Sequence, residues 1–228
     1  MDGILPFDKP AGISSARAVN QITPLLPRKT KIGHAGTLDS FATGLLLLLV
    51  GKATRLCEQL MDQPKQYEAM VKFGATTVTD DLESAEQICE VPSIPTIQQV
   101  RDALQFFIGT VEQVPPLYSA LKIQGRRSSD MARRGTPISP KARPVRIDAI
   151  ELLDFTWPLL KLRIDCGRGT YIRALARDLG EKLAVGGYLT ELRRTRIGTF
   201  NVTDAAMLTD LQRCGVETYF RLPPCPLP

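Results

Sequence analysis

The chain has 228 residues, of which 43% are hydrophobic, and its 29 Lys and Arg residues outnumber its 24 Asp and Glu residues to give a net charge of +5. No apolar run approaches the roughly 20 residues that cross a bilayer, so we expect a globular protein with no membrane segment. The five cysteines are scattered without a CxxC pair, and the chain has one histidine. This composition argues against a zinc site or a disulfide framework and favours a reducing, cytoplasmic compartment.

Charge is distributed unevenly along the chain. Residues 58–112 carry ten acidic side chains against three basic ones, whereas residues 122–146 carry eight basic side chains against Asp130 alone. A cationic stretch of this kind indicates a polyanion as partner. The alternative is an ordinary solvated basic surface, and composition does not separate the two.

The first third of the chain contains short apolar stretches separated by turn residues. Residues 3–7 are typical of a strand, and Ser14 can N-cap a helix that ends near Ile22. Residues 45–50 form an uninterrupted apolar run that suits a buried core strand, and residues 52–61 have helical spacing.

The middle of the chain has clearer periodicity. In residues 65–73 every second side chain belongs to one apolar face, which predicts a half-buried strand. Thr96 and Gln99 form a capping box ahead of a helix that Gly109 stops. Residues 111–123 are expected to form a strand that two prolines interrupt.

The last third completes the fold class. Strands are expected at residues 147–155 and 160–166, and Thr170 is expected to cap an amphipathic helix. A final strand ends at Phe200, and a short helix spans residues 203–214. Strands in runs, without regular βαβ alternation, predict an α+β fold with a mostly antiparallel sheet.

Residues 31–51 concentrate the groups that are able to do chemistry. The single histidine, His34, lies between glycines, and Asp39 follows in a Thr-Leu-Asp-Ser segment ahead of the apolar run. Glycines permit tight turns and close backbone approach, and the apolar run can anchor the loop in a core. Active-site loops are often built in this way, although a polar loop with Asp39 capping a turn is the alternative on composition alone.

Residues 33–44 closely resemble the GHxGxLDPxAxG signature of the TruB-type tRNA pseudouridine synthases. Five further stretches agree with this family in the family's order: residues 9–15, 65–67, 118–122, 169–173 and 192–194. One motif can arise by chance, but six in register are specific. The resemblance covers about residues 3–203 and implies a mixed, largely antiparallel central sheet with flanking helices.

The resemblance also implies an activity, which is the isomerisation of uridine 55 in the T loop of tRNA to pseudouridine, with the T stem-loop as substrate. By position it implies these roles: Asp39 as the catalytic aspartate, Tyr67 as the base-stacking tyrosine, Tyr171 as a second active-site tyrosine, Arg173 as the arginine that pairs with the aspartate, His34 as the histidine that packs into the RNA, Lys122 as the lysine of the SALK motif, and Leu192 as a substrate-binding residue.

The chemistry of this reaction explains why such residue types suffice. It breaks the N1–C1′ bond, rotates the uracil and rejoins it through C5, so we expect no cofactor and no metal. A carboxylate such as Asp39 can attack C1′, attack C6 of the base or assist 2′ deprotonation, and the sequence leaves all three open. An aromatic ring such as Tyr67 can stack on the flipped base, and a guanidinium such as Arg173 favours the ionised carboxylate.

We expect residues 1–215 to form one catalytic domain and residues 216–228 to form a Pro-rich tail. The basic stretch 122–146 is expected to be an RNA-clamping insertion that, with the arginines of residues 193–196, binds phosphates. A complete C-terminal RNA-binding module, which most family members carry, is not expected. Ser40 stands where the family usually has proline, which predicts a less rigid loop at that point.

Three functions compete on this sequence: a tRNA pseudouridine synthase, a related synthase that acts on another RNA, and a non-catalytic tRNA-binding or RNA-folding protein. The presence of Asp39, Tyr67, Tyr171 and Arg173 together argues against the third as the sole function. No obligate protein partner is inferred.

Overall fold

The computed structural model describes residues 1–119, 121–123, 126–134 and 140–221. Its contacts divide the chain into two compact units. The first unit contains residues 1–67 together with the chain from residue 192 onward, and the second contains residues 68–191. The boundaries fall inside two strands, β4 (Lys65–Phe73) and β12 (Gly187–Ile197), so the chain passes between the units without a separate linker.

The first unit is built on strand β3 (Thr43–Val50). Strands β1 (Gly3–Lys9) and β2 (Ile32–Ala35) both pair antiparallel with it, and β12 pairs parallel with its first residues. The short strand β13 (Phe200–Asn201) returns antiparallel to the end of β12. One parallel pairing among antiparallel ones makes this sheet mixed and mostly antiparallel, which confirms the expected fold class.

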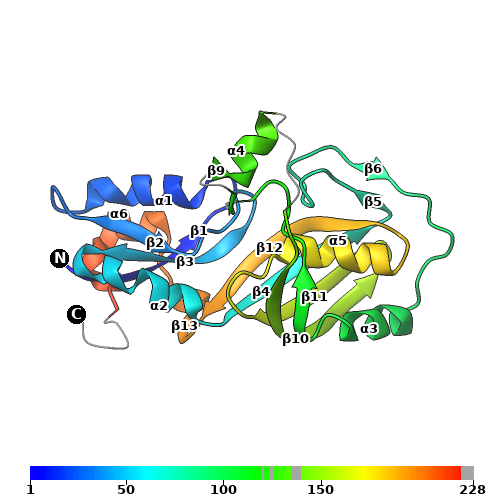
Figure 1. Cartoon of the computed structure of the whole chain (residues 1–228). Coiled ribbons are helices and arrows are strands. Elements are labelled where there is room, and N and C mark those ends of the chain that lie inside the picture. The colour runs from blue at the N-terminus through cyan, green and yellow to red at the C-terminus, as the bar shows by residue number, and fades with distance from the viewer. Residues whose placement is uncertain (120, 124–125, 135–139, 222–228) are drawn as a thin grey trace. The chain divides into compact units, whose positions relative to one another are not determined.

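The apolar run of residues 45–50 is covered on both sides. One face of the sheet packs against α1 (Ser15–Ile22) and α6 (Leu208–Cys214), and the other against the 3₁₀ turn η2 (Gly51–Leu56) and α2 (Cys57–Asp62), as Figure 1 shows. Every residue of the run is at most 1% exposed. A strand that is buried on both faces has a continuous apolar sequence rather than an alternating one.

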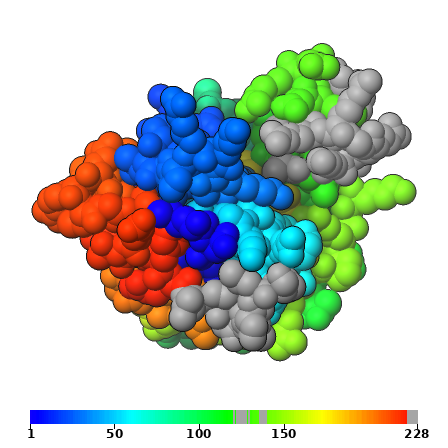
Figure 2. Space-filling model, turned by 90° about the vertical axis from the view of Figure 1, so that its left-hand side faces the viewer, coloured from blue at the N-terminus to red at the C-terminus, as the bar shows by residue number. Residues whose placement is uncertain are grey.

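The two ends of the described chain meet in the first unit. Ile4 of β1 forms an isolated bridge with Arg221, and Leu211 of α6 packs into the same cluster as Leu5 and Phe7. Figure 2 shows these segments side by side, in blue and in red. The expected helix over residues 203–214 is shorter in the structure, because its first part is the 3₁₀ turn η3 (Val202–Asp204) and α6 starts only after it.

The second unit places two helices against an antiparallel sheet. Strand β10 (Arg143–Thr156) pairs with β7 (Gly109–Gln113) and with β11 (Leu159–Cys166). Helix α3 (Ile97–Gln105) contacts β10 and α5 (Ile172–Lys182) (Figure 1). Shorter elements complete the chain: η1 (Thr23–Leu25), β5 (Ala75–Thr76), β6 (Gln87–Ile88), β8 (Lys122–Ile123), β9 (Arg126–Arg127), α4 (Ser128–Arg133) and η4 (Val216–Tyr219).

Local sequence signals account for most of these boundaries. The capping box of Thr96 and Gln99 begins α3, and burial alternates strictly along β4. The prolines after Gln113 end the expected strand over residues 111–123 early, because proline cannot donate to a sheet ladder. Thr170 was expected to cap α5, and this is wrong by one residue: Tyr171 is the N-cap residue, and the Thr170 hydroxyl donates instead to backbone carbonyls upstream.

Candidate active site

The loop that carries Asp39 connects β2 to β3 in the first unit, and residues outside the loop hold its backbone. The Ser15 hydroxyl, 2% exposed, accepts from the Leu38 N–H at 2.9 Å and donates to the Leu38 carbonyl at 3.0 Å. The Ser40 carbonyl accepts from the Gly12 N–H at 2.8 Å and from Lys9 Nζ at 3.3 Å. The backbones of Leu38 and Ser40, which flank the half-buried Asp39, are therefore held by residues outside the loop.

Arg194 of β12 also holds this loop through hydrogen bonds from its guanidinium. Its guanidinium donates from Nε to the Leu45 carbonyl at 2.7 Å and from Nη2 to the Gly36 carbonyl at 3.2 Å. Gly44 allows the backbones of β3 and β12 to lie close together here, since a Cβ on Gly44 would lie 2.3 Å from the Arg194 carbonyl oxygen. Arg194 is 1% exposed, so the expectation that it binds phosphate is wrong. It is a buried support of the loop.

His34 lies on β2 next to this loop. Burial and, to a smaller extent, the positive charge of Arg194 lower the pKa of the imidazole, so it is neutral at physiological pH. Its Nδ1 is buried and has no hydrogen-bond partner within the described residues. A neutral ring with an unused polar atom is suited to packing against a base.

Tyr67 and Leu192 complete the predicted site residues of the first unit. Tyr67 lies on β4 and is 9% exposed, and Leu192 lies on β12 and is 6% exposed. The structure thus brings four predicted residues, His34 and Asp39 among them, into one compact unit. The stacking role of Tyr67 stays a prediction.

Arg173 is a buried charged residue of the second unit. It lies in the first turn of α5, and its Nη1 donates to Asp81 Oδ2 at 3.0 Å in an ion pair whose side chains are 4% and 1% exposed. It also donates to the carbonyls of Thr79 and Tyr118, both at 2.9 Å. Arg173 therefore ties the Tyr118 segment to α5. Its expected pairing with Asp39 joins residues of different units and stays a prediction.

Tyr171 and Lys122 are the predicted site residues that remain. Tyr171 is the N-cap residue of α5 and belongs to the second unit. The backbone of Lys122 lies in β8, while its side chain is outside the described part of the structure. Residues 128–133 of the same basic stretch form α4. Arg193 donates with both Nη atoms to Asp8, at 3.1 and 2.7 Å.

Sequence reasoning did not single out the residues that support the loop. Lys9 and Ser15 occur in a motif shared with the family, but nothing in a lysine or a serine indicates a buried hydrogen-bonding role. Asp81 was only one of the ten acidic side chains of residues 58–112. Such residues are found by the position of their partners, which sequence spacing does not supply.

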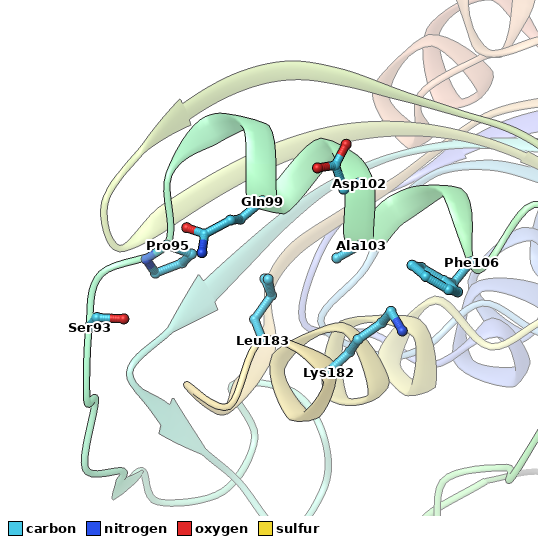
Figure 3. Close-up of a pocket in the computed structure, with 8 residues that line it drawn as sticks. All are labelled: Ser93, Pro95, Gln99, Asp102, Ala103, Phe106, Lys182 and Leu183. Atoms are coloured by element: carbon cyan, nitrogen blue, oxygen red, sulfur yellow. The ribbon is translucent and has the colours of Figure 1, made fainter.

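A cavity of about 340 Å³ lies between α3 and α5 (Figure 3). It is lined by residues such as Phe106, Asp102 and Lys182, and none of the predicted site residues contributes to it. Lys182 ends α5, whereas Tyr171 begins it, so the cavity is at the other end of that helix.

Within the described residues, no group of His, Cys, Asp and Glu can hold a metal ion, and no helix is long and apolar enough to span a membrane.

Two family models together match residues 25–220 of the chain. A model of the TruB family pseudouridylate synthase N-terminal domain matches residues 25–172, and a model of the tRNA pseudouridylate synthase B C-terminal domain matches residues 173–220. The fold and the signature loop thus define a pseudouridine synthase, which is an isomerase.

Two curated relatives identify the family more closely. The tRNA pseudouridine synthase B of Aromatoleum aromaticum is 47% identical over 218 residues, which is 96% of this chain and 70% of that protein. The protein of the same name in Phocaeicola vulgatus is 45% identical over 206 residues, which is 88% of each chain. The chain belongs to the TruB family.

A solved structure has the same fold. A chain in the crystal structure of a Cbf5–Nop10–Gar1 complex superposes with a TM-score of 0.72 at 28% identity. The match covers 96% of this chain and 58% of that one. The agreement confirms the α+β fold.

Proposed function

We propose that this protein isomerises uridine 55 in the T loop of tRNA to pseudouridine. The observation that carries the proposal is the signature loop, in which the buried side chains of Ser15 and Lys9 bind the backbones of Leu38 and Ser40, the two neighbours of Asp39. Catalytic groups need such support, because a carboxylate must meet the reacting atom in one geometry. Relatives that are 47% and 45% identical carry the name tRNA pseudouridine synthase B.

Asp39 is the proposed catalytic carboxylate. It stabilises positive character at C1′ or forms a covalent bond to the sugar or to the base while the uracil is detached. It has to stay ionised in a site that excludes water, and a neighbouring guanidinium favours the ionised form. We assign that guanidinium to Arg173, with Asp81 holding it.

The other residues act on the base. The ring of Tyr67 stacks on the flipped uracil, an interaction worth roughly 1–3 kcal/mol per base. The hydroxyl of Tyr171 transfers a proton at the sugar or at C5. His34, which burial keeps neutral, fills the space that the flipped base leaves. Leu192 contacts the substrate through apolar surface, and Lys122 contacts it through charge.

The test combines tritium release with mapping. Purified protein is incubated with a tRNA transcript that contains 5-tritiated uridine, and mass spectrometry locates the pseudouridine. We expect one modified site at position 55, and no product there when that uridine is replaced by cytidine. Asp39→Asn should lower the rate by at least about a thousandfold and leave RNA affinity within several-fold. Asp102→Asn, on the exposed face of α3, is the matched control and should keep the wild-type rate.

Each competing function has its own outcome in this assay. Wild-type turnover by Asp39→Asn contradicts the catalytic assignment. Pseudouridine formed only in another RNA identifies a related synthase. Tight binding of tRNA without tritium release from the wild-type protein identifies a non-catalytic RNA-binding protein.

We further propose that recognition is confined to the T stem-loop, needs no protein partner and takes place in the cytoplasm. The basic stretch of residues 122–146 supplies phosphate contacts along one arm, and such contacts provide most of the affinity. The purified chain alone should therefore convert an isolated stem-loop nearly as well as full-length tRNA. A loss of kcat/KM by two orders of magnitude, about 2.7 kcal/mol, contradicts this confined recognition.

A further inference from the structure

The start of α5 has an unusual arrangement. Tyr171 is its N-cap residue, and its side chain makes no capping hydrogen bond. Helix starts leave backbone N–H groups that need partners from elsewhere. Gln113, at the end of β7, supplies one here: its Oε1 accepts from the Tyr171 N–H at 2.8 Å, and its Nε2 donates to the Tyr171 carbonyl at 3.1 Å. Gln113 is 3% exposed, so this pair of hydrogen bonds is shielded from water.

The ring of Tyr171 is held by a second residue. The guanidinium carbon of Arg143 lies 5.1 Å from the centroid of the Tyr171 ring, which is the geometry of a cation–π contact. Nη2 of Arg143 donates to the Gly169 carbonyl at 3.1 Å, which anchors one end of the guanidinium. Its Nε is buried and has no hydrogen-bond partner among the described residues, so the stacked position is not explained by hydrogen bonding alone.

The two holding residues are neighbours across the sheet. In the register between β10 and β7, Arg143 lies directly opposite Gln113. Opposed residues of an antiparallel pair project from the same face of the sheet. One rigid pair of strands therefore contacts both the backbone and the ring of the same tyrosine.

The residue types fit this task. A glutamine amide carries a donor and an acceptor side by side and so matches the N–H and C=O of one residue. A guanidinium is planar and stacks on an aromatic ring while its edge donates a hydrogen bond, which a lysine ammonium does not do in the same way.

We propose that Gln113 and Arg143 are positioning residues that set the place of the Tyr171 hydroxyl, Gln113 through the backbone and Arg143 through the ring. This inference rests on the proposed role of Tyr171 in proton transfer. Proton transfer needs the two heavy atoms within about 2.6–3.2 Å, so a small rotation of the ring removes the hydroxyl from reach. The alternative for Arg143 is a direct contact with an RNA phosphate.

Kinetics separate positioning from phosphate binding. The test variants are Arg143→Lys, which keeps the charge, and Gln113→Glu, which keeps the size and the acceptor but removes the donor. The matched controls are Arg101→Lys and Gln105→Glu on the exposed face of α3. Single-turnover rates at saturating protein report chemistry, and filter binding at fixed salt reports affinity. For the test variants we expect rates about 10- to 100-fold lower with affinity within about threefold, and wild-type values for the controls.

A second background tests whether Arg143 acts through Tyr171. In Tyr171→Ala there is no ring to hold, so adding Arg143→Lys should lower the residual rate by less than about twofold. Losses that multiply in this background overturn the proposal. So does an Arg143→Lys variant whose affinity falls while its saturated rate is unchanged, because that is the signature of a phosphate contact.

A spectroscopic measurement is independent of activity. Protein labelled with 3-fluorotyrosine gives a ¹⁹F resonance for Tyr171 that is assigned by its disappearance in Tyr171→Phe. This resonance should shift in Arg143→Lys and stay in place in Arg101→Lys. If the wild-type protein forms no pseudouridine but the resonance responds, the proposed function fails and the positioning stands. If the wild-type protein is active and neither the resonance nor the rate responds, the positioning proposal fails.

Discussion

The buried ion pair of Asp81 and Arg173 predicts a large and specific loss of stability for Asp81→Asn. The side chains are 1% and 4% exposed, and their atoms are 3.0 Å apart. Asparagine keeps the shape and an acceptor for the Glu83 N–H, which now donates to Asp81 Oδ1 at 2.9 Å, so the main change is the lost charge. Removing one partner of a buried pair costs about 3–5 kcal/mol, since the other charge stays buried without that compensation.

The assay is urea and thermal unfolding followed by fluorescence of Trp157, the single tryptophan of the chain. Trp157 stacks on Phe73 at 6.1 Å between ring centroids, inside the second unit, and so reports on the unit that contains the ion pair. For a chain of this size about 2–4 °C accompanies each kcal/mol, so the melting temperature should fall by about 6–20 °C.

Asp148→Asn is the matched control for this prediction. Asp148 pairs with Arg146 at 2.5 Å, but the two side chains are 36% and 74% exposed, and such a pair contributes about 0–1 kcal/mol. If Asp81→Asn and Asp148→Asn lose the same small amount, the reasoning from burial is refuted. Replacing both buried partners, as Asp81→Leu with Arg173→Met, should recover much of the stability.

Three further predictions concern pH, stacking and ions. Burial raises the pKa of Asp80 from 3.8 to about 6 against the opposing charge of Arg177, so the folded state binds this proton more tightly than the unfolded state. The free energy of unfolding should therefore fall as pH rises from about 4 to 6, and urea titrations of Asp80→Asn should lack that part of the decline. Tyr67→Ala should lose much more tritium release than Tyr67→Phe, because the ring face rather than the hydroxyl is used, and equal losses would contradict stacking. Activity should persist in excess EDTA, while RNA affinity measured by filter binding should fall steeply with salt.

The parts of the fold that the sequence predicted are those in which a local pattern has one physical meaning. The apolar run of β3 suited a buried core strand, which the structure confirms, and the capping box of Thr96 and Gln99 marked a helix start at the right residue. Thr170 misled because its hydroxyl donates to the carbonyls of Gly167 and Arg146, while Gln113 satisfies the helix start from 58 residues away. A side chain that acts at such a separation leaves no local signal.

In the candidate site, too, some residues have a local sequence signal and others do not. Asp39 and His34 stand out because they lie in the stretch that resembles the family signature, and the structure places both in one unit. Arg194 was expected to contact phosphate because it lies among other arginines. The structure buries it, because its guanidinium donates to the carbonyls of Leu45 and Gly36 inside the first unit. The sequence does not show where these carbonyls lie. Charge in a sequence does not reveal which charges face water.

The support of the Asp39 loop has a consequence for synthesis of the protein. Arg194 reaches carbonyls of that loop and of the start of β3, which lie 149 to 158 positions earlier in the chain. Contacts of such length form late, because a long loop must close before they contribute. A ribosome-bound chain that ends before β12 already contains Asp39 and its glycines, but it lacks the guanidinium that fixes them. The nascent enzyme therefore acquires its active geometry only when β12 has been made, long after the aspartate itself.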